Sequence, residues 1–144
     1  MTNENSDAAI RQIIEARANA ARTGDVDAIM ANVSDDVMVF DVVDPLRHLG
    51  KQSSRERAAK WVGSYEGPIG LEIRDLQVYV DGDVAFSHAL SHVTGTLKTM
   101  AEVDMWFRTT FGLRRIDGRW LIVHDHGSVP FDPKSGKVSL ALNP

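Results

Sequence analysis

The residues best suited to chemistry lie near the C-terminus, in the segment 119–131. β-Branched and aromatic residues favour a strand there, and Asp117-Gly118 just before it is typical of a hairpin turn. Successive strand side chains point to opposite faces, so strict alternation predicts that Asp125 lies on one face and that the even-numbered residues share the other. The residues predicted to share that face are Trp120, Ile122, His124, His126 and Ser128. We interpret this face as a pocket floor, apolar at one end, with two imidazoles and a hydroxyl at the other.

Two histidines beside a serine are open to three interpretations. The first is a polar patch held together by packing and hydrogen bonds. The second is a site at which His124 or His126 acts as a general acid or base. The third is a metal site, for which His88, Asp41 or Asp104 would have to supply a third ligand. No spacing in the sequence fixes such a ligand, so we predict no metal and no cofactor.

Asp41 is a lone carboxylate at the end of an apolar strand predicted over residues 37–42. A carboxylate in apolar surroundings is a stronger base than one in water, so this position suits a general base. The alternative is an aspartate that starts the turn before Asp44-Pro45.

A third set of polar residues, Asp104, Trp106 and Arg108, shares one face of a strand predicted over 102–115. If that face points inward, Arg108 can neutralise Asp104, Asp41 or the carboxylate of a ligand, because a buried charge needs a partner. The reverse parity would direct Phe107 and Phe111 inward. We favour the first arrangement because it places the tryptophan inside.

The remaining pocket candidates come from other elements. His88 lies in the middle of a strand predicted over 84–94, and Trp61 lies on one face of a helix predicted over about 54–65. The residues predicted to contact a ligand are Trp61, His88, Trp106, Arg108, Trp120 and Ser128.

These elements predict an α+β fold in a single domain, residues 1–144, with its core at about 7–135. The helical pattern is confined to the N-terminal half, and long strands follow residue 70. The strands can cover their apolar face only with the helices. We therefore expect a strongly curved mixed or antiparallel sheet wrapped around three helices, with a cone-shaped pocket at its open end. The second face of the sheet is also partly apolar, which predicts a homodimer through the outer face.

Composition narrows the partners. The chain has 144 residues and a net charge of −4, and no basic run exceeds two residues, so we expect no nucleic-acid partner. No apolar run approaches the roughly 18 residues that span a bilayer, so we expect no membrane association. There is no cysteine, which agrees with a cytoplasmic protein. A small hydrophobic molecule is the expected ligand.

Four segments together suggest a family: residues 22–29, 40–46, 104–110 and 120–131. Over about residues 7–135 the chain resembles the SnoaL-like and ketosteroid-isomerase-like branch of the nuclear transport factor 2-like superfamily. The resemblance implies a curved sheet on three helices, a deep apolar cone and often a homodimer. The superfamily includes isomerases, cyclases, dehydratases, hydrolases and non-catalytic binding modules, so a fold of this kind does not fix an activity.

The resemblance also implies roles for single residues. Asp41 matches the proton-shuttling aspartate of the isomerases, and Asp104 is similar to their second, protonated aspartate, which helps to bind the oxyanion. Arg17 stands where the isomerases place the tyrosine of the oxyanion hole, so the chain departs from their pattern there.

These observations predict a cofactor-independent isomerase or lyase that acts on a small apolar carbonyl compound. Asp41 would remove a proton, His124 or His126 would donate to the enolate oxygen, and Arg108 would orient an anionic group or pair with Asp104. The alternative is a non-catalytic small-molecule-binding or dimeric scaffold protein of the same fold.

Overall fold

The computed structural model describes residues 2–144 and contains three helices and six strands within that range. In chain order the elements are α1 (Asn3–Thr23), α2 (Val26–Ile29), β1 (Val33–Phe40), β2 (His48–Leu49), α3 (Lys51–Gly63), β3 (Tyr65–Asp81), β4 (Val84–Leu97), β5 (Glu102–Ile116) and β6 (Arg119–Ser128).

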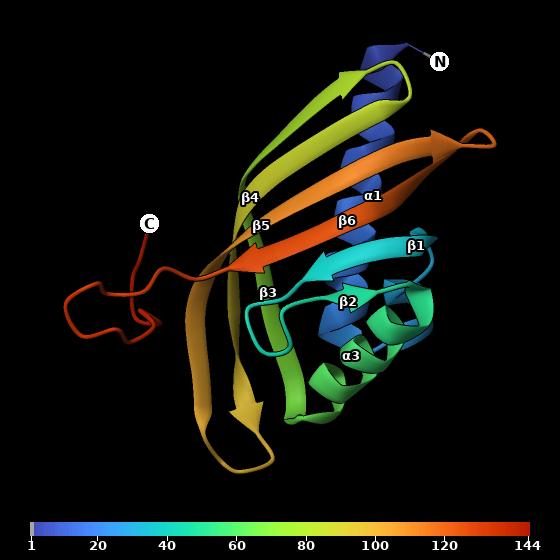
Figure 1. Ribbon diagram of the computed structural model, residues 1–144. Helices are drawn as coiled ribbons and strands as arrows, with labels where there is room; N and C mark the ends of the chain where they lie inside the picture. Colours follow the sequence, from blue (N-terminus) through green and yellow to red (C-terminus); the bar gives the residue numbers. More distant parts are fainter. Residues whose placement is uncertain (1) are drawn as a thin grey trace.

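The six strands form one sheet in the order β2-β1-β6-β5-β4-β3. β1 and β6 are parallel, whereas all other neighbours are antiparallel, so the sheet is mixed. The long strands curve around α1, and α3 lies beside the start of β3 (Figure 1). The predicted fold class, a curved sheet wrapped on three helices, is confirmed.

The helix α1 owes its position to one apolar face. Ile10, Ile14 and Ala18 recur at helical spacing and are buried against the sheet. The side chain of Thr2 caps the N-terminus, and Gly24 ends the helix with a φ of 70°, a conformation that glycine adopts without strain. The helix therefore begins earlier than its apolar pattern alone predicts.

The core lies between α1 and the concave face of the sheet. Val37, Val39, Leu113 and Ile122 are each at most 1% exposed, and together they line the sheet side of this core. Full burial of such a side chain stabilises a fold by about 1.5–3 kcal/mol. This packing fixes which face of each strand points inward, and so which polar residues can reach a ligand.

One irregularity in β6 changes which of its side chains point inward. Gly112 pairs with His124, but the next residue of β5, Leu113, pairs with Ile122. Val123 is therefore an extra residue, a β-bulge, and side-chain alternation shifts by one position beyond it. Gly112 leaves room for the bulge, because a Cβ atom there would lie 3.2 Å from Cβ of His124.

Some element boundaries differ from those predicted. α3 begins at Lys51 after Gly50 and has no side-chain cap, although Ser53 and Glu56 have the spacing of a capping box. Ser53 instead contacts the ring of His48. β1 begins at Val33, ahead of the strand predicted over 37–42. Among residues 2–144, no helix has the length and apolar character needed to cross a membrane.

Candidate functional site

The site begins with a contact between β1 and α3. Asp41 directly follows β1, and its Oδ2 lies 2.8 Å from Nε of Arg57 in α3. The two side chains are 17% and 21% exposed, so the pair is largely enclosed yet open to solvent. The structure thus places Asp41, the predicted base, inside the fold beside a guanidinium group.

A second pair adjoins the first. Oδ2 of Asp125 accepts a hydrogen bond of 3.0 Å from Arg17 of α1 and lies 3.5 Å from Nη2 of Arg57. The side chain of Asp125 is 8% exposed. Because Arg57 touches both carboxylates, the four residues form one connected group, which we call the ion-pair quartet: Arg17, Asp41, Arg57 and Asp125.

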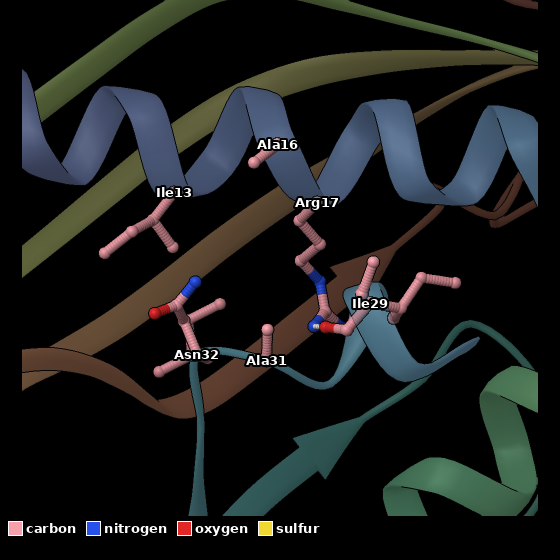
Figure 2. Close-up of a pocket in the computed structure, with 8 residues that line it drawn as sticks. Ile13, Ala16, Arg17, Ile29, Ala31 and Asn32 are labelled. Atoms are coloured by element: carbon pink, nitrogen blue, oxygen red, sulfur yellow. Dashed lines mark hydrogen bonds between the residues drawn. The ribbon is translucent and has the colours of Figure 1, made fainter. Parts of the chain in front are cut away.

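Charge balance makes this arrangement tolerable in a partly dry interior. Two guanidinium groups face two carboxylates, which offsets the cost of removing each charge from water. Burial lowers the pKa of Arg17, the attraction of Asp125 raises it, and the nearby Arg57 lowers it again. Arginine nevertheless stays protonated in proteins. Arg17 also donates a hydrogen bond of 2.7 Å to the backbone oxygen of Ile29 (Figure 2), so α1, α2 and β6 are tied together at this point.

Arg57 retains an unused donor. Its Nε atom is buried and makes no hydrogen bond of acceptable geometry with any residue in 2–144, although it lies close to Asp41. The contact is therefore a close charge–charge contact in which the N–H bond is not directed at the carboxylate. A buried donor without an acceptor is costly, and a ligand oxygen could satisfy it.

An apolar cluster continues from the quartet. Trp61 lies one helical turn beyond Arg57, and it packs with Phe107 against a group of buried residues from β3 and β4. Those buried residues are Tyr65, Ile69 and Val93. The rings of Trp61 and Tyr65 meet edge to face at 5.6 Å. Burial raises the pKa of Tyr65, with the side chain of Trp61 opposing the shift, so the phenol stays neutral.

The predicted grouping of His124, His126 and Ser128 with Trp120 and Ile122 is wrong. The bulge at Val123 separates the two sets. Trp120 and Ile122 are buried in the core, whereas both histidines contact Phe40 on the outer face of the sheet, with ring centroids 4.8 and 5.4 Å away. Within one subunit these histidines and Asp41 therefore lie on opposite faces.

The preferred parity of β5 is also wrong. Phe111 is buried, and Phe107 packs in the apolar cluster, so the outer face carries Asp104, Trp106 and Arg108. Trp106 stacks on His92 with centroids 4.5 Å apart, which gives this tryptophan a partner outside the core.

Hydrogen bonds agree with that placement. Asp104, carried over as the second aspartate of the isomerases, is 77% exposed and lies 2.6 Å from Nε2 of His92. Arg108 donates a hydrogen bond of 3.0 Å to the hydroxyl oxygen of Ser128 on β6. Asp104 and Arg108 therefore both face away from the interior.

The two other predicted contact residues also lie away from the quartet. His88 is exposed on the outer face, 5.9 Å from the ring of Tyr79. Trp120 is on the inner face but near the start of β6, five residues before Asp125. Of the six predicted contact residues, Trp61 lies one helical turn from Arg57 on α3. In residues 2–144 no three or more histidine, aspartate or glutamate side chains are arranged to hold a metal ion.

Three members of the quartet were not predicted as site residues. Arg57 stands four residues before Trp61, so the helical period puts both on one face, and this signal could have identified it. Asp125 is a carboxylate within an otherwise apolar strand segment, but strict alternation assigned it to the wrong face. Arg17 was noted only as a departure from the isomerase pattern.

A family model agrees with this fold. The model that describes a SnoaL-like domain matches residues 10–132. The chain belongs to the SnoaL-like family. This family is part of the nuclear transport factor 2-like superfamily, so the predicted relationship is confirmed. None of the curated proteins compared with the chain matches it.

Solved structures agree with the SnoaL-like assignment. A nuclear transport factor 2-like protein of unknown function from Pseudomonas putida KT2440 is 30% identical, with 100% of both chains covered and a TM-score of 0.91. A ketosteroid isomerase-like protein from Erwinia carotovora atroseptica is 24% identical, with 84% of this chain and 93% of that chain covered and a TM-score of 0.73. A candidate dehydratase from Streptomyces avermitilis is 17% identical, with 91% of this chain and 100% of that chain covered and a TM-score of 0.78. The last two similarities show a shared fold.

Proposed function

We propose that this SnoaL-like protein is a cofactor-independent isomerase or lyase that moves a proton on a small, mostly apolar carbonyl compound. The observation that supports this most is the 2.8 Å contact between Asp41 and Arg57 where the ion-pair quartet meets the apolar cluster. Removal of a proton next to a carbonyl needs a base and a donor for the developing oxyanion in a partly dry site. Asp41 supplies the first and Arg57 the second.

In the proposed reaction Asp41 takes a proton from the carbon next to the carbonyl. The electron pair of the broken C–H bond moves onto the carbonyl oxygen, which accepts a hydrogen bond from Arg57. The proton then returns at a different carbon in an isomerisation, or a leaving group departs in an elimination. Trp61 and Phe107 hold the apolar part of the substrate, and Arg17 and Asp125 position Arg57.

This proposal replaces the predicted donors His124 and His126, which lie on the other face of the sheet from Asp41. Arg57 is better placed, because it lies 2.8 Å from Asp41 and its side chain is 21% exposed. The ketosteroid isomerase-like protein and the candidate dehydratase that share the fold agree with a reaction of this class.

Proton abstraction can be tested without knowing the product. A panel of small ketones and enones is incubated with the protein in D₂O, and exchange at the α-carbon is followed by NMR. Asp41→Asn should slow exchange by about 10²–10⁴-fold and Arg57→Met by about 10²–10³-fold. The matched controls are Asp35→Asn on β1 and Arg55→Met on α3, both at exposed charges, and they should leave the rate unchanged. Exchange that persists in Asp41→Asn would rule Asp41 out as the base.

One observation favours the alternative, a non-catalytic binding protein. The quartet is balanced without a ligand, because each carboxylate already touches a guanidinium group. Such a protein would bind apolar compounds in the same place, as followed by tryptophan fluorescence, and would catalyse no exchange. Asp41→Asn would then leave ligand affinity within about threefold, a change of under 1 kcal/mol.

We further propose that the protein is a cytoplasmic homodimer that associates through the outer face of the sheet. Tyr79 and Phe86 are each 50% exposed there and stack at 4.9 Å. The same face carries both signs of charge, with Arg108 and Asp104 on β5, so two copies related by a two-fold axis can pair opposite charges. Light scattering should give twice the chain mass of 15.9 kDa. Phe86→Lys should yield monomers, whereas Leu46→Lys, at an exposed loop position, should not.

A further inference from the structure

A hollow lies on the helix side of the molecule, between α1 and the segment that joins α2 to β1 (Figure 2). Its volume is about 160 Å³. The residues that line it are Ile13, Ala16, Arg17, Ala28, Ile29, Ala31, Asn32 and Ile122. None of them belongs to the apolar cluster beside Asp41, and only Arg17 is shared with the quartet. We call this hollow the α1–α2 cavity.

The walls of the α1–α2 cavity are mainly aliphatic. Ile29 and Ile122 are 5% and 1% exposed and form its deepest part, while exposed alanines at the rim keep it open. Side chains larger than alanine at the rim would fill the space, so the small residues preserve a volume that the fold could have closed. An engineered apolar cavity of about 150 Å³ in another protein holds one benzene molecule, which gives the size of an occupant.

Two polar groups border this aliphatic space. The carboxamide of Asn32 points toward α1 near Ile13 (Figure 2), and it makes no hydrogen bond with any residue in 2–144. It therefore offers one donor and one acceptor to an occupant. The guanidinium of Arg17 forms another part of the wall, and its flat face can stack on an aromatic ring.

We propose that the α1–α2 cavity binds a neutral, benzene-sized molecule that carries one hydroxyl or carbonyl group. The ring would lie against Ile29, Ile122 and the guanidinium face, and the polar group would bond to Asn32. A neutral ligand fits because Arg17 already pairs with Asp125 at 3.0 Å. An anion would add a charge without a partner in a space that is half closed to water.

This site goes beyond the reaction proposed for Asp41 and Arg57. Its occupant would touch Arg17, which also holds Asp125 and through it borders Arg57. A molecule bound at the α1–α2 cavity would therefore fix the position of Arg17 and act on the quartet from outside the apolar cluster. The site has the placement expected of an effector site.

The test is an NMR titration of the full chain with phenol, with benzoate as the charged comparison. Methyl signals of Ile13, Ile29 and Ile122 should shift with saturation in phenol, show NOEs to the ring, and stay unchanged in benzoate. Ala16→Leu should abolish saturation by filling the rim. Ala8→Leu, at another exposed alanine of α1, should not.

A second variant tests the polar contact. Asn32→Ala should weaken phenol binding by about three- to tenfold, the effect of one lost hydrogen bond, with an unchanged melting temperature. Three results would overturn the proposal: shifts that rise linearly without saturation, equal phenol affinity in Ala16→Leu, or NOEs from phenol to Trp61 and Phe107 instead. The last would show that the probe enters the apolar cluster and leaves the α1–α2 cavity empty.

Discussion

Replacing Asp125 with asparagine should destabilise the protein severely. The change keeps the shape of the side chain but removes the charge that faces Arg17 at 3.0 Å and Arg57 at 3.5 Å. Arg17 would then lose its carboxylate partner, and Arg57 would keep its contact with Asp41. Because Asp125 is 8% exposed, water cannot replace the lost partner.

The expected loss follows from the burial of the pair. Removing one partner of a buried ion pair costs about 3–5 kcal/mol. Domains of this size unfold with about 5–15 kcal/mol, so Asp125→Asn should lose a large part of the total. At about 2–4 °C per kcal/mol, the melting temperature should fall by about 6–20 °C. Urea unfolding at pH 7, followed by circular dichroism, gives the free energy of unfolding directly.

The matched control is Asp83→Asn. Asp83 contacts Arg115 at 2.6 Å, a shorter distance than any in the quartet, but its side chain is 69% exposed. A surface pair contributes about 0–1 kcal/mol, so this variant should be nearly as stable as the parent. If Asp125→Asn costs under about 1 kcal/mol, or if both variants cost the same, then burial does not govern the strength of these pairs.

Three further predictions concern other parts of the fold. In the Tyr79→Phe variant, absorbance at 295 nm should show Tyr65 ionising above pH 10, the ordinary value, because burial raises its pKa. The stability that the neutral phenol contributes is present below pH 10 and is lost as pH rises further. A midpoint at or below pH 10 would contradict this. Gly95→Ala should cost about 1–3 kcal/mol in urea, since a Cβ atom would lie 2.8 Å from the ring of Tyr65, whereas Gly82→Ala, which meets no atom within 4 Å, should cost only its backbone strain. Nitrogen NMR should find a proton on Nδ1 of His124, which lies 2.8 Å from a backbone oxygen of β1 that can only accept; an Nδ1 without a proton would refute that hydrogen bond.

The sequence predicts the architecture of this protein well because the relevant signals are local. The apolar face of α1, the turn residues and the β-rich second half are all visible within short windows. The predicted start of α3, at about residue 54, is wrong: the helix begins at Lys51, and Ser53 contacts the ring of His48, five residues earlier, in place of a cap. The residue type and strand-end position of Asp41 led to its prediction as a site residue, and the structure places it beside Arg57.

The rest of the site depends on contacts between distant segments. Asp41 meets Arg57 across 16 positions of the chain, and Asp125 meets Arg17 across 108. No periodicity encodes such pairs. The parity errors have a different cause: Trp106 was assigned inward because tryptophan is usually buried, yet its stack on His92 gives it an outer partner.

The bulge at Val123 also affects how the family should be compared. In a relative with the same number of residues but a regular strand in place of the bulge, the counterpart of His124 would face the interior and the counterpart of Asp125 would face outward. Conversely, a relative that lacks a residue at position 123 would keep the inner aspartate. Residue-by-residue transfer of roles along β6 is therefore valid only among members that share the bulge or that align with a gap at position 123. A relative that keeps the chain length but has a regular strand here exchanges the side chains that face the interior without substituting any polar residue.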